Sequence, residues 1–278
     1  MALARSGYTL LALGQRRQAE EAFSELRALA TRTGNIVTKL QSLGTDSYLA
    51  LVEGRFDEAA GMFERAIAFA EQFGTRGMLA LAPMRASIHL GASVESFLPE
   101  RSGGLTNPSM AVLYAHLGRQ EEASRVLDAA VVRRPGFGTR EDESSALDDI
   151  LYLEASVLLG HCQVAEMLLK RLAGAGYVAC WAQPTCTSRH LGGAAALLGR
   201  HDEARRHYLE AIRVCTEMRF RPELALTRLQ LAELLLEHYP SEKKDALEHL
   251  DFAIKEFREM KMQPSLERVL RHKEILKA

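Results

Sequence analysis

Apolar residues recur at three- and four-residue spacing along almost the whole chain. Within the segment 56–73, FDEAAGMFERAIAFAEQF, one such stripe contains Phe56, Ala59, Phe63, Ala66 and Ala70. The segment 225–238, ALTRLQLAELLLEH, has the same period. This spacing is typical of amphipathic α-helices, whereas the apolar alternation of β-strands is scarce. The pattern predicts an elongated all-α protein of roughly 14 or 15 helices, with no sheet.

A second pattern repeats at about 40 residues: a Gly, an Ala five positions later, and a large apolar residue four positions after that. It occurs as Gly14/Ala19/Phe23, Gly54/Ala59/Phe63, Gly118/Ala123/Leu127, Gly160/Ala165/Leu169 and Gly199/Ala204/Tyr208. Each Gly separates two amphipathic segments, at a point where a tight turn needs positive φ. The small Ala lets two helices approach closely, and the bulky residue fills the space one turn later. The pattern predicts a row of helical hairpins.

These units resemble tetratricopeptide repeats (TPRs) in a lengthened form. The resemblance is clearest where Tyr114, Gly118, Ala123, Leu127, Ala130 and Pro135 hold the expected spacings, and again at Leu191, Gly192, Gly199, Ala204, Tyr208 and Ala211. It implies that residues 1–278 form one domain, an α-solenoid wound as a right-handed superhelix. About seven hairpins are expected, at residues 1–34, 35–74, 76–100, 107–135, 143–174, 185–219 and 221–260.

Three parts of the array depart from the regular unit. Residues 76–100 lack the Ala and aromatic markers, so this hairpin is expected to be degenerate. Residues 264–277 are expected to form a capping helix that packs Leu266, Val269, Leu270 and Leu276 on the last hairpin. The N-terminus begins inside a hairpin without a cap. We therefore expect an exposed face near Tyr8 and Leu11, available for self-association or for preceding repeats.

The last third of the chain also looks like the C-terminal helical region of large bacterial signalling ATPases of the STAND or AAA type, some linked to a nucleotide cyclase or a LuxR-type domain. Its segments RPELALTRLQLAELLLEHYP and MQPSLERVLRHKEILKA carry this resemblance. The motifs of those catalytic and DNA-binding modules are absent from the sequence. The resemblance implies a sensor or interaction segment of a longer signalling protein.

Charge and composition exclude several classes of partner. A formal net charge of −1 provides no electrostatic footprint for nucleic acid or an anionic membrane. No run of about 18 apolar residues suggests a transmembrane helix, and the first residues lack the layout of a signal peptide. Four cysteines in 278 residues are too few for a disulfide scaffold and suit a reducing compartment. We expect a cytoplasmic protein.

The residues that could carry chemistry have simpler explanations. The motif GAGYVA at 174–179 fits a dinucleotide-binding fingerprint, but the helical segment before it favours an inter-repeat loop. Cysteine and histidine side chains invite zinc or nucleophilic chemistry, although their spacing is not that of a structural zinc site and buried thiols are favoured; these are His161, Cys162, Cys180, Cys186 and His190. Trp181 is expected to pack between hairpins or, alternatively, to contact a ligand.

We therefore expect a non-enzymatic scaffold that binds a protein or peptide in its concave groove, without metal or cofactor. The alternative is a regulatory receptor that senses a small molecule or peptide; an enzyme is the third hypothesis. The TPR resemblance implies that the first helix of each hairpin lines the groove. It selects Tyr48, His116, Glu154, Arg189 and Glu233 as groove residues. Because these polar side chains are taken to be exposed, changing Glu154 and Arg189 together to Ala is expected to leave folding intact and to weaken binding of the partner.

Overall fold

The computed structural model of the chain describes residues 2–71, 84–98, 106–174, 178–179 and 183–275. Fourteen α-helices account for most of these described residues, so the predicted all-α class is confirmed. The expectation of no sheet is wrong in one detail. Strands β1 (Val178–Ala179) and β2 (Thr185–Cys186) form a two-residue antiparallel ladder.

Six pairs of consecutive helices are joined by short turns. They are α1 (Ala2–Ala12) with α2 (Arg16–Thr33), α3 (Ile36–Val52) with α4 (Phe56–Glu71), α6 (Pro108–His116) with α7 (Gln120–Leu127), α8 (Ala146–Leu159) with α9 (Cys162–Arg171), α10 (Thr187–Leu197) with α11 (His201–Glu217), and α12 (Arg221–His238) with α13 (Lys243–Glu259). The chain continues from α7 as a π-helical turn, Asp128–Val132, and a 3-10 turn, Pro240–Glu242, separates α12 from α13. Each pair buries an apolar stripe that neither helix covers alone.

The repeated pattern of glycine, alanine and a large residue acts as its spacing predicts. All five glycines adopt positive φ, between 69° and 76°. All five alanines are fully buried, and the large residues are at most 5% exposed. Two glycines inside first helices allow the closest approaches. A Cβ on Gly192 would lie 2.6 Å from the ring of Tyr208, and one on Gly7 would overlap the ring of Phe23.

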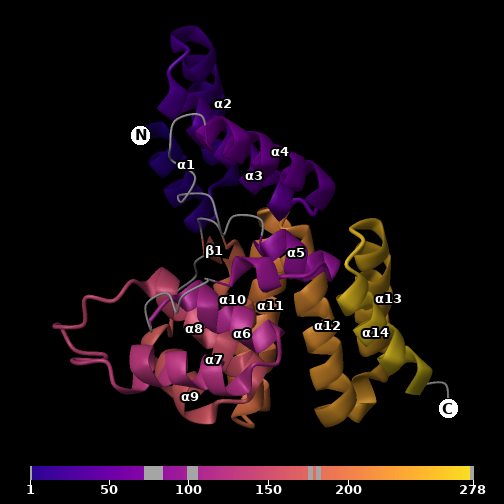
Figure 1. Cartoon of the computed structure of the whole chain (residues 1–278). Coiled ribbons are helices and arrows are strands. Elements are labelled where there is room, and N and C mark those ends of the chain that lie inside the picture. The colour runs from indigo at the N-terminus through magenta and orange to yellow at the C-terminus, as the bar shows by residue number, and fades with distance from the viewer. Residues whose placement is uncertain (1, 72–83, 99–105, 175–177, 180–182, 276–278) are drawn as a thin grey trace.

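The segment expected as a degenerate hairpin contains one short helix where it is described. Helix α5 (Met84–Leu90) is followed by the 3-10 turn Glu95–Phe97, and positions 76–83 and 99–100 lie outside the described residues. Figure 1 shows α5 at the centre of the molecule, between the N-terminal helices and α12. This segment therefore lies where the surrounding pairs face one another.

The C-terminal helix packs as expected for most of its length. Helix α14 (Gln263–Ile275) buries Val269 completely, with Leu266 and Leu270 against the same core, while Leu276 lies outside the described residues. The opposite side of α14 is tied to the preceding pair by ion pairs. Arg268 pairs with Glu233 of α12, and Lys273 pairs with Asp251 of α13.

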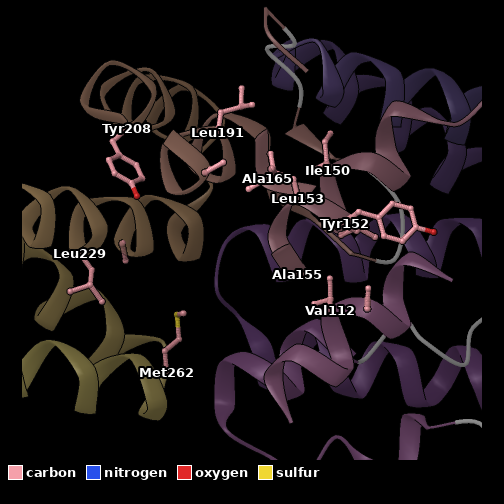
Figure 2. Close-up of a cluster of buried hydrophobic side chains, with 14 of the residues drawn as sticks. Val112, Ile150, Tyr152, Leu153, Ala155, Ala165, Leu191, Tyr208, Leu229 and Met262 are labelled. Atoms are coloured by element: carbon pink, nitrogen blue, oxygen red, sulfur yellow. The ribbon is translucent and has the colours of Figure 1, made fainter. Parts of the chain in front are cut away.

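One apolar cluster runs through most of the pairs. Figure 2 shows it extending from Val112 of α6 to Leu229 of α12 and to Met262, beside α14. A second cluster joins the first two pairs to the end of α11, where Leu11 and Phe23 share a core with Phe220.

Through this second cluster the N-terminal pairs contact the C-terminal ones. Arg16 Nη1 donates to the carbonyl of Met218 at 2.5 Å, and Lys261 pairs with Asp57 at 2.7 Å. The expected exposed face near Tyr8 and Leu11 is therefore wrong. Leu11 is fully buried, and the Tyr8 ring packs edge-on against Phe23 and Tyr48.

Candidate functional site

Charged and imidazole side chains from five helices gather where the helix pairs face α5. We call this group the inner cluster. It consists of Arg85 and His89 of α5, His116 of α6, Glu154 of α8, Arg189 and His190 of α10, and Glu223 of α12. Except for His116, whose side chain is 28% exposed, all of them are buried. Buried ionic groups are costly unless they are paired, so their pairing is informative.

Arg85 and Glu154 form the first ion pair. Nη1 and Nη2 of Arg85 donate to the two carboxylate oxygens of Glu154 at 2.6 and 2.8 Å. This parallel, two-bond arrangement is the strong form of the arginine–carboxylate interaction. It spans 69 residues of sequence and attaches α5 to α8. The Nε of Arg85 is also buried and has no hydrogen-bond partner among the described residues.

Arg189 and Glu223 form the second ion pair. Nε and Nη2 of Arg189 donate to the carboxylate of Glu223 at 2.6 and 3.0 Å. The backbone N–H of Cys186 donates to the same carboxylate at 2.9 Å. Glu223 lies in the first turn of α12, where the helix dipole favours negative charge. The pair therefore attaches α10 and the adjacent strand β2 to the start of α12.

His190 connects the two ion pairs. Its Nε2 lies 2.6 Å from Thr185 Oγ1, 3.3 Å from Arg189 Nη2 and 3.8 Å from a carboxylate oxygen of Glu154. A guanidinium can only donate, so Nε2 accepts and the imidazole is neutral. Burial lowers the pKa of His190 well below its usual value, and the charge of Arg189 lowers it further.

The pKa values of Glu154 and His89 also depend on burial and on the charge of Arg85. Burial alone would raise the pKa of Glu154, but the charge and hydrogen bonds of Arg85, together with the neighbouring His190 and His116, outweigh it and hold that pKa well below the usual value. Burial lowers the pKa of His89 well below its usual value, and Arg85 adds to the effect. The fold therefore holds Glu154 as a carboxylate, and His89 and His190 as neutral imidazoles.

The predicted groove residues divide between three places. His116, Glu154 and Arg189 converge in the inner cluster, where His116 Nε2 lies 4.0 Å from the Glu154 carboxylate. Tyr48 is 3% exposed and packs against the Tyr8 ring in the second apolar cluster. Glu233 is bound by Arg268 and by His272, at 2.8 Å, beside α14.

The premise that all these side chains are solvated is wrong. Glu154 is 4% exposed and Arg189 is 8% exposed, because α5 and β2 cover the helix faces from which they project. The expectation that both can be changed to Ala without effect on folding loses its physical basis. Each change would leave a buried charge without its partner.

Three members of the cluster were not selected from the sequence. Arg85 and His89 lie in the segment that departs from the repeat pattern, and Glu223 has the appearance of an acidic residue at a helix start. The available signal was that Arg85 and His89 are four residues apart, and therefore on one face of a short helix. Sequence spacing does not say which surface that face meets.

The structure shows where the described cysteines and the motif at 174–179 lie. Cys186 and Cys215 are buried free thiols, whereas Cys162 is exposed, so the expectation of a buried thiol is wrong for Cys162. Cys180 and Trp181 lie outside the described residues. No cluster of three metal-ligating side chains occurs in the described part of the chain. The motif at 174–179 follows helix α9, and its last two residues form β1.

Described residues also line two surface hollows, which are built differently from the inner cluster. One, of about 510 Å³, lies beside the stacked rings of His201 and His238, whose centroids are 3.5 Å apart. The other, of about 220 Å³, lies between α11, α12 and α13, where Arg228 stacks over Phe252. Both draw only on adjacent helix pairs. The inner cluster joins α5 to the first helices of four pairs and is the stronger candidate site.

No protein-family model matches this sequence, and a search of curated proteins finds no significant match. Among the described helices, none combines the length and apolar character needed to cross a membrane.

Proposed function

We propose that this chain is a non-enzymatic interaction module of the tetratricopeptide type. In this proposal it is an α-solenoid of about seven hairpins, with the α5 segment as the degenerate one and α14 as the cap. The positive φ of the five turn glycines and the buried alanines support it. So do the matching close approaches of Gly7 to Phe23 and of Gly192 to Tyr208, each spanning 16 positions.

The observation that carries the functional proposal is the convergence of charge on the inner cluster. Four first helices of successive pairs (α6, α8, α10 and α12) each contribute a charged or imidazole side chain to it. Apolar residues of similar size would often give equal or greater stability than a buried ion pair. Oriented buried charges are well suited to recognising a charged segment of a partner. We therefore assign partner binding to this inner surface.

The ligand-sensing receptor is the second candidate. It is favoured by the contact between the first two helix pairs and the turns after α11 and α13. A ligand at the inner cluster would change how these distant pairs meet, so binding would alter the shape of the whole array. In either form, we propose a module of a bacterial signalling protein. Its free buried thiols suit a reducing cytoplasm.

Site-directed crosslinking tests the assignment. A photo-crosslinking amino acid at position 116, the partly exposed edge of the inner cluster, should capture a partner protein from a lysate of the source organism. The same group at position 213, which is exposed on α11, is the matched control. Capture from position 116 but not from 213 supports the proposal. Capture from 213 alone, or from both positions equally, would assign binding to another surface.

A further inference from the structure

The α5 segment departs from the repeat in both sequence and structure. Gly91 follows α5 with φ of 71°, as the turn glycines do. The positions that should then hold a small and a large apolar residue hold Ser96 and Glu100. In the described residues 84–98, a 3-10 turn and no second α-helix follows α5. Among the described residues, α5 is therefore not paired with a second helix of its own hairpin.

Helix α5 is buried or half-buried along its whole length, and two side-chain contacts fix its position. Arg85 is 2% exposed and reaches Glu154, while His89, one turn later, lies against Phe56 with ring centroids 5.3 Å apart. Met84 is also buried. Anchoring by residues at i and i+4 is how a short helical peptide binds in a groove. Helix α5 thus has the contacts of a bound peptide, although it belongs to the same chain.

The Glu154 carboxylate specifies what kind of group this position accepts. Its oxygens lie 3.8 Å from His190 and 4.0 Å from His116, and His190 is held neutral. Without a cation beside it, Glu154 would be a buried charge lacking compensation. A guanidinium supplies two parallel N–H groups as well as the charge, which an ammonium does not. The position therefore requires an arginine.

The fit of Arg85 is also incomplete. Its Nε is buried and finds no acceptor in the described part of the structure. A buried donor without a partner weakens an interaction appreciably. Arg85 retains its place because a segment of the same chain has a high effective concentration at the site. An arginine of a second molecule whose Nε also finds an acceptor binds Glu154 more strongly, and this gain offsets the high effective concentration of Arg85.

We propose that α5 occupies the partner-binding position of the inner cluster, and that the partner is a helical peptide segment whose arginine replaces Arg85 on Glu154. This inference rests on the function proposed above and specifies its partner. The recognised segment carries an arginine and, four residues later, a histidine or aromatic residue. The partner segment then binds as α5 leaves the same position, so that one helix replaces the other.

A peptide competition experiment tests the exchange. The probe is a fluorescein-labelled peptide of residues 84–98, MRASIHLGASVESFL, titrated with the full-length chain and followed by anisotropy. The chain variant Arg85→Ala/His89→Ala removes the two anchors of α5. It should bind the probe at least about tenfold more tightly than the unmodified chain, in which the position is filled.

Three further titrations locate the binding. A probe with Arg85→Ala should bind the double variant about tenfold more weakly, because it lacks the guanidinium. Adding Glu154→Gln to the double variant should have the same effect. Adding Glu237→Gln, an exposed carboxylate on the same array, should leave the affinity unchanged. If the double variant does not fold, as judged by circular dichroism, Arg85→Lys replaces it, since it keeps the charge but loses the paired bonds.

The outcomes separate this inference from the proposed function. Equal binding of the probe to the unmodified chain and to the α5 variants, or binding that does not depend on Glu154, would overturn the exchange. Crosslinking from position 116 would in that case still support an inner binding surface for a different segment. Absence of both crosslinking and probe binding would reject the two proposals together.

Discussion

Glu154 and Glu223 are carboxylates that the fold removes from water, and each has an arginine as its main partner. Substitutions in these ion pairs are poorly tolerated, because a buried charge is stable only while its partner remains. The imidazoles beside them follow the opposite rule, since burial and neighbouring guanidinium groups favour their neutral form. The inner cluster therefore depends on Glu154 remaining a carboxylate and on His89 and His190 remaining neutral.

Removal of one arginine should reveal this dependence. Arg189→Ala leaves the fully buried Glu223 without its ion-pair partner, so the free energy of unfolding should fall by about 3–5 kcal/mol. Urea denaturation followed by circular dichroism measures the change. Arg213→Ala is the matched control, because Arg213 pairs only with exposed carboxylates on its own helix. A loss no larger for Arg189→Ala than for Arg213→Ala would contradict the burial of this pair.

The pH dependence of stability follows from the two neutral imidazoles. His89 and His190 have folded-state pKa values well below 6.5, whereas in the unfolded chain they take up protons near pH 6.5. Stability is therefore fully present above pH 6.5 and falls as the pH decreases below it, by up to about 1.4 kcal/mol per pH unit for each imidazole. Urea midpoints between pH 7.5 and 5 should fall accordingly.

The variant His190→Gln should make that pH dependence shallower, because it removes one of the buried imidazoles whose protonation favours the unfolded chain. Glu154 acts in the same direction only at lower pH, because its folded pKa lies well below 4.5. Its stabilising contribution is present above pH 4.5 and is lost as the pH falls through its folded pKa. A stability that stays constant between pH 7.5 and 5 would show that the imidazoles are not buried in their neutral form.

At the scale of the element, each hairpin depends on how closely its two helices approach. Gly7 and Gly192 lie inside helices, where glycine lowers intrinsic helix stability. They occur there because an aromatic ring of the second helix occupies the space of their Cβ atoms. The repeat is therefore defined by interhelical distance as much as by its turns.

Two glycine substitutions separate these effects. Gly192→Ala should destabilise the protein by about 1–3 kcal/mol, because its Cβ would lie 2.6 Å from the Tyr208 ring. Gly44→Ala in α3 meets nothing within 4 Å and should stabilise by about 0.5–1 kcal/mol through helix propensity. Thermal unfolding compares the two variants. Shifts of the same sign for both would mean that close approach does not control residue choice at position 192.

At the scale of the whole molecule, the first helix pairs touch the turns that follow α11 and α13. The contact combines apolar packing of Leu11 and Phe220 with the Arg16 hydrogen bond to Met218 and the Lys261–Asp57 ion pair. In an open array each repeat contacts only its neighbours, and the end repeats unfold first. The contact seen here couples the first pair to the rest of the chain.

Leucine substitutions test this coupling. Leu11→Ala should lower the stability of the whole protein by about 2–5 kcal/mol, because Leu11 is fully buried in the shared cluster. Leu13→Ala, which removes a side chain that is 57% exposed, should change stability by less than about 0.5 kcal/mol. A single cooperative thermal transition is expected for both variants. A separate early transition in Leu11→Ala would show that the first pair unfolds independently.

Much of the fold follows from short-range pattern. The 3.6-residue period of apolar positions predicts the helices, and the spacing from Gly199 to Ala204 and Tyr208 predicts both a turn and the close contact after it. These features depend on residues within about 20 positions of one another, so local sterics and helix geometry are sufficient to specify them. The all-α class and the turn positions were determined by the sequence in this direct sense.

The burial and pairing of the inner cluster were decided by contacts between residues far apart in the sequence. Whether Glu154 is solvated or buried depends on Arg85, 69 positions earlier, and on the packing that brings α5 to α8. Periodicity describes which residues share a helix face but not which other face covers them. A charged residue on an apolar helix is compatible with solvent, a ligand or an internal partner. Only the tertiary structure chooses between these, because burial and ion pairing arise when distant segments meet and exclude water.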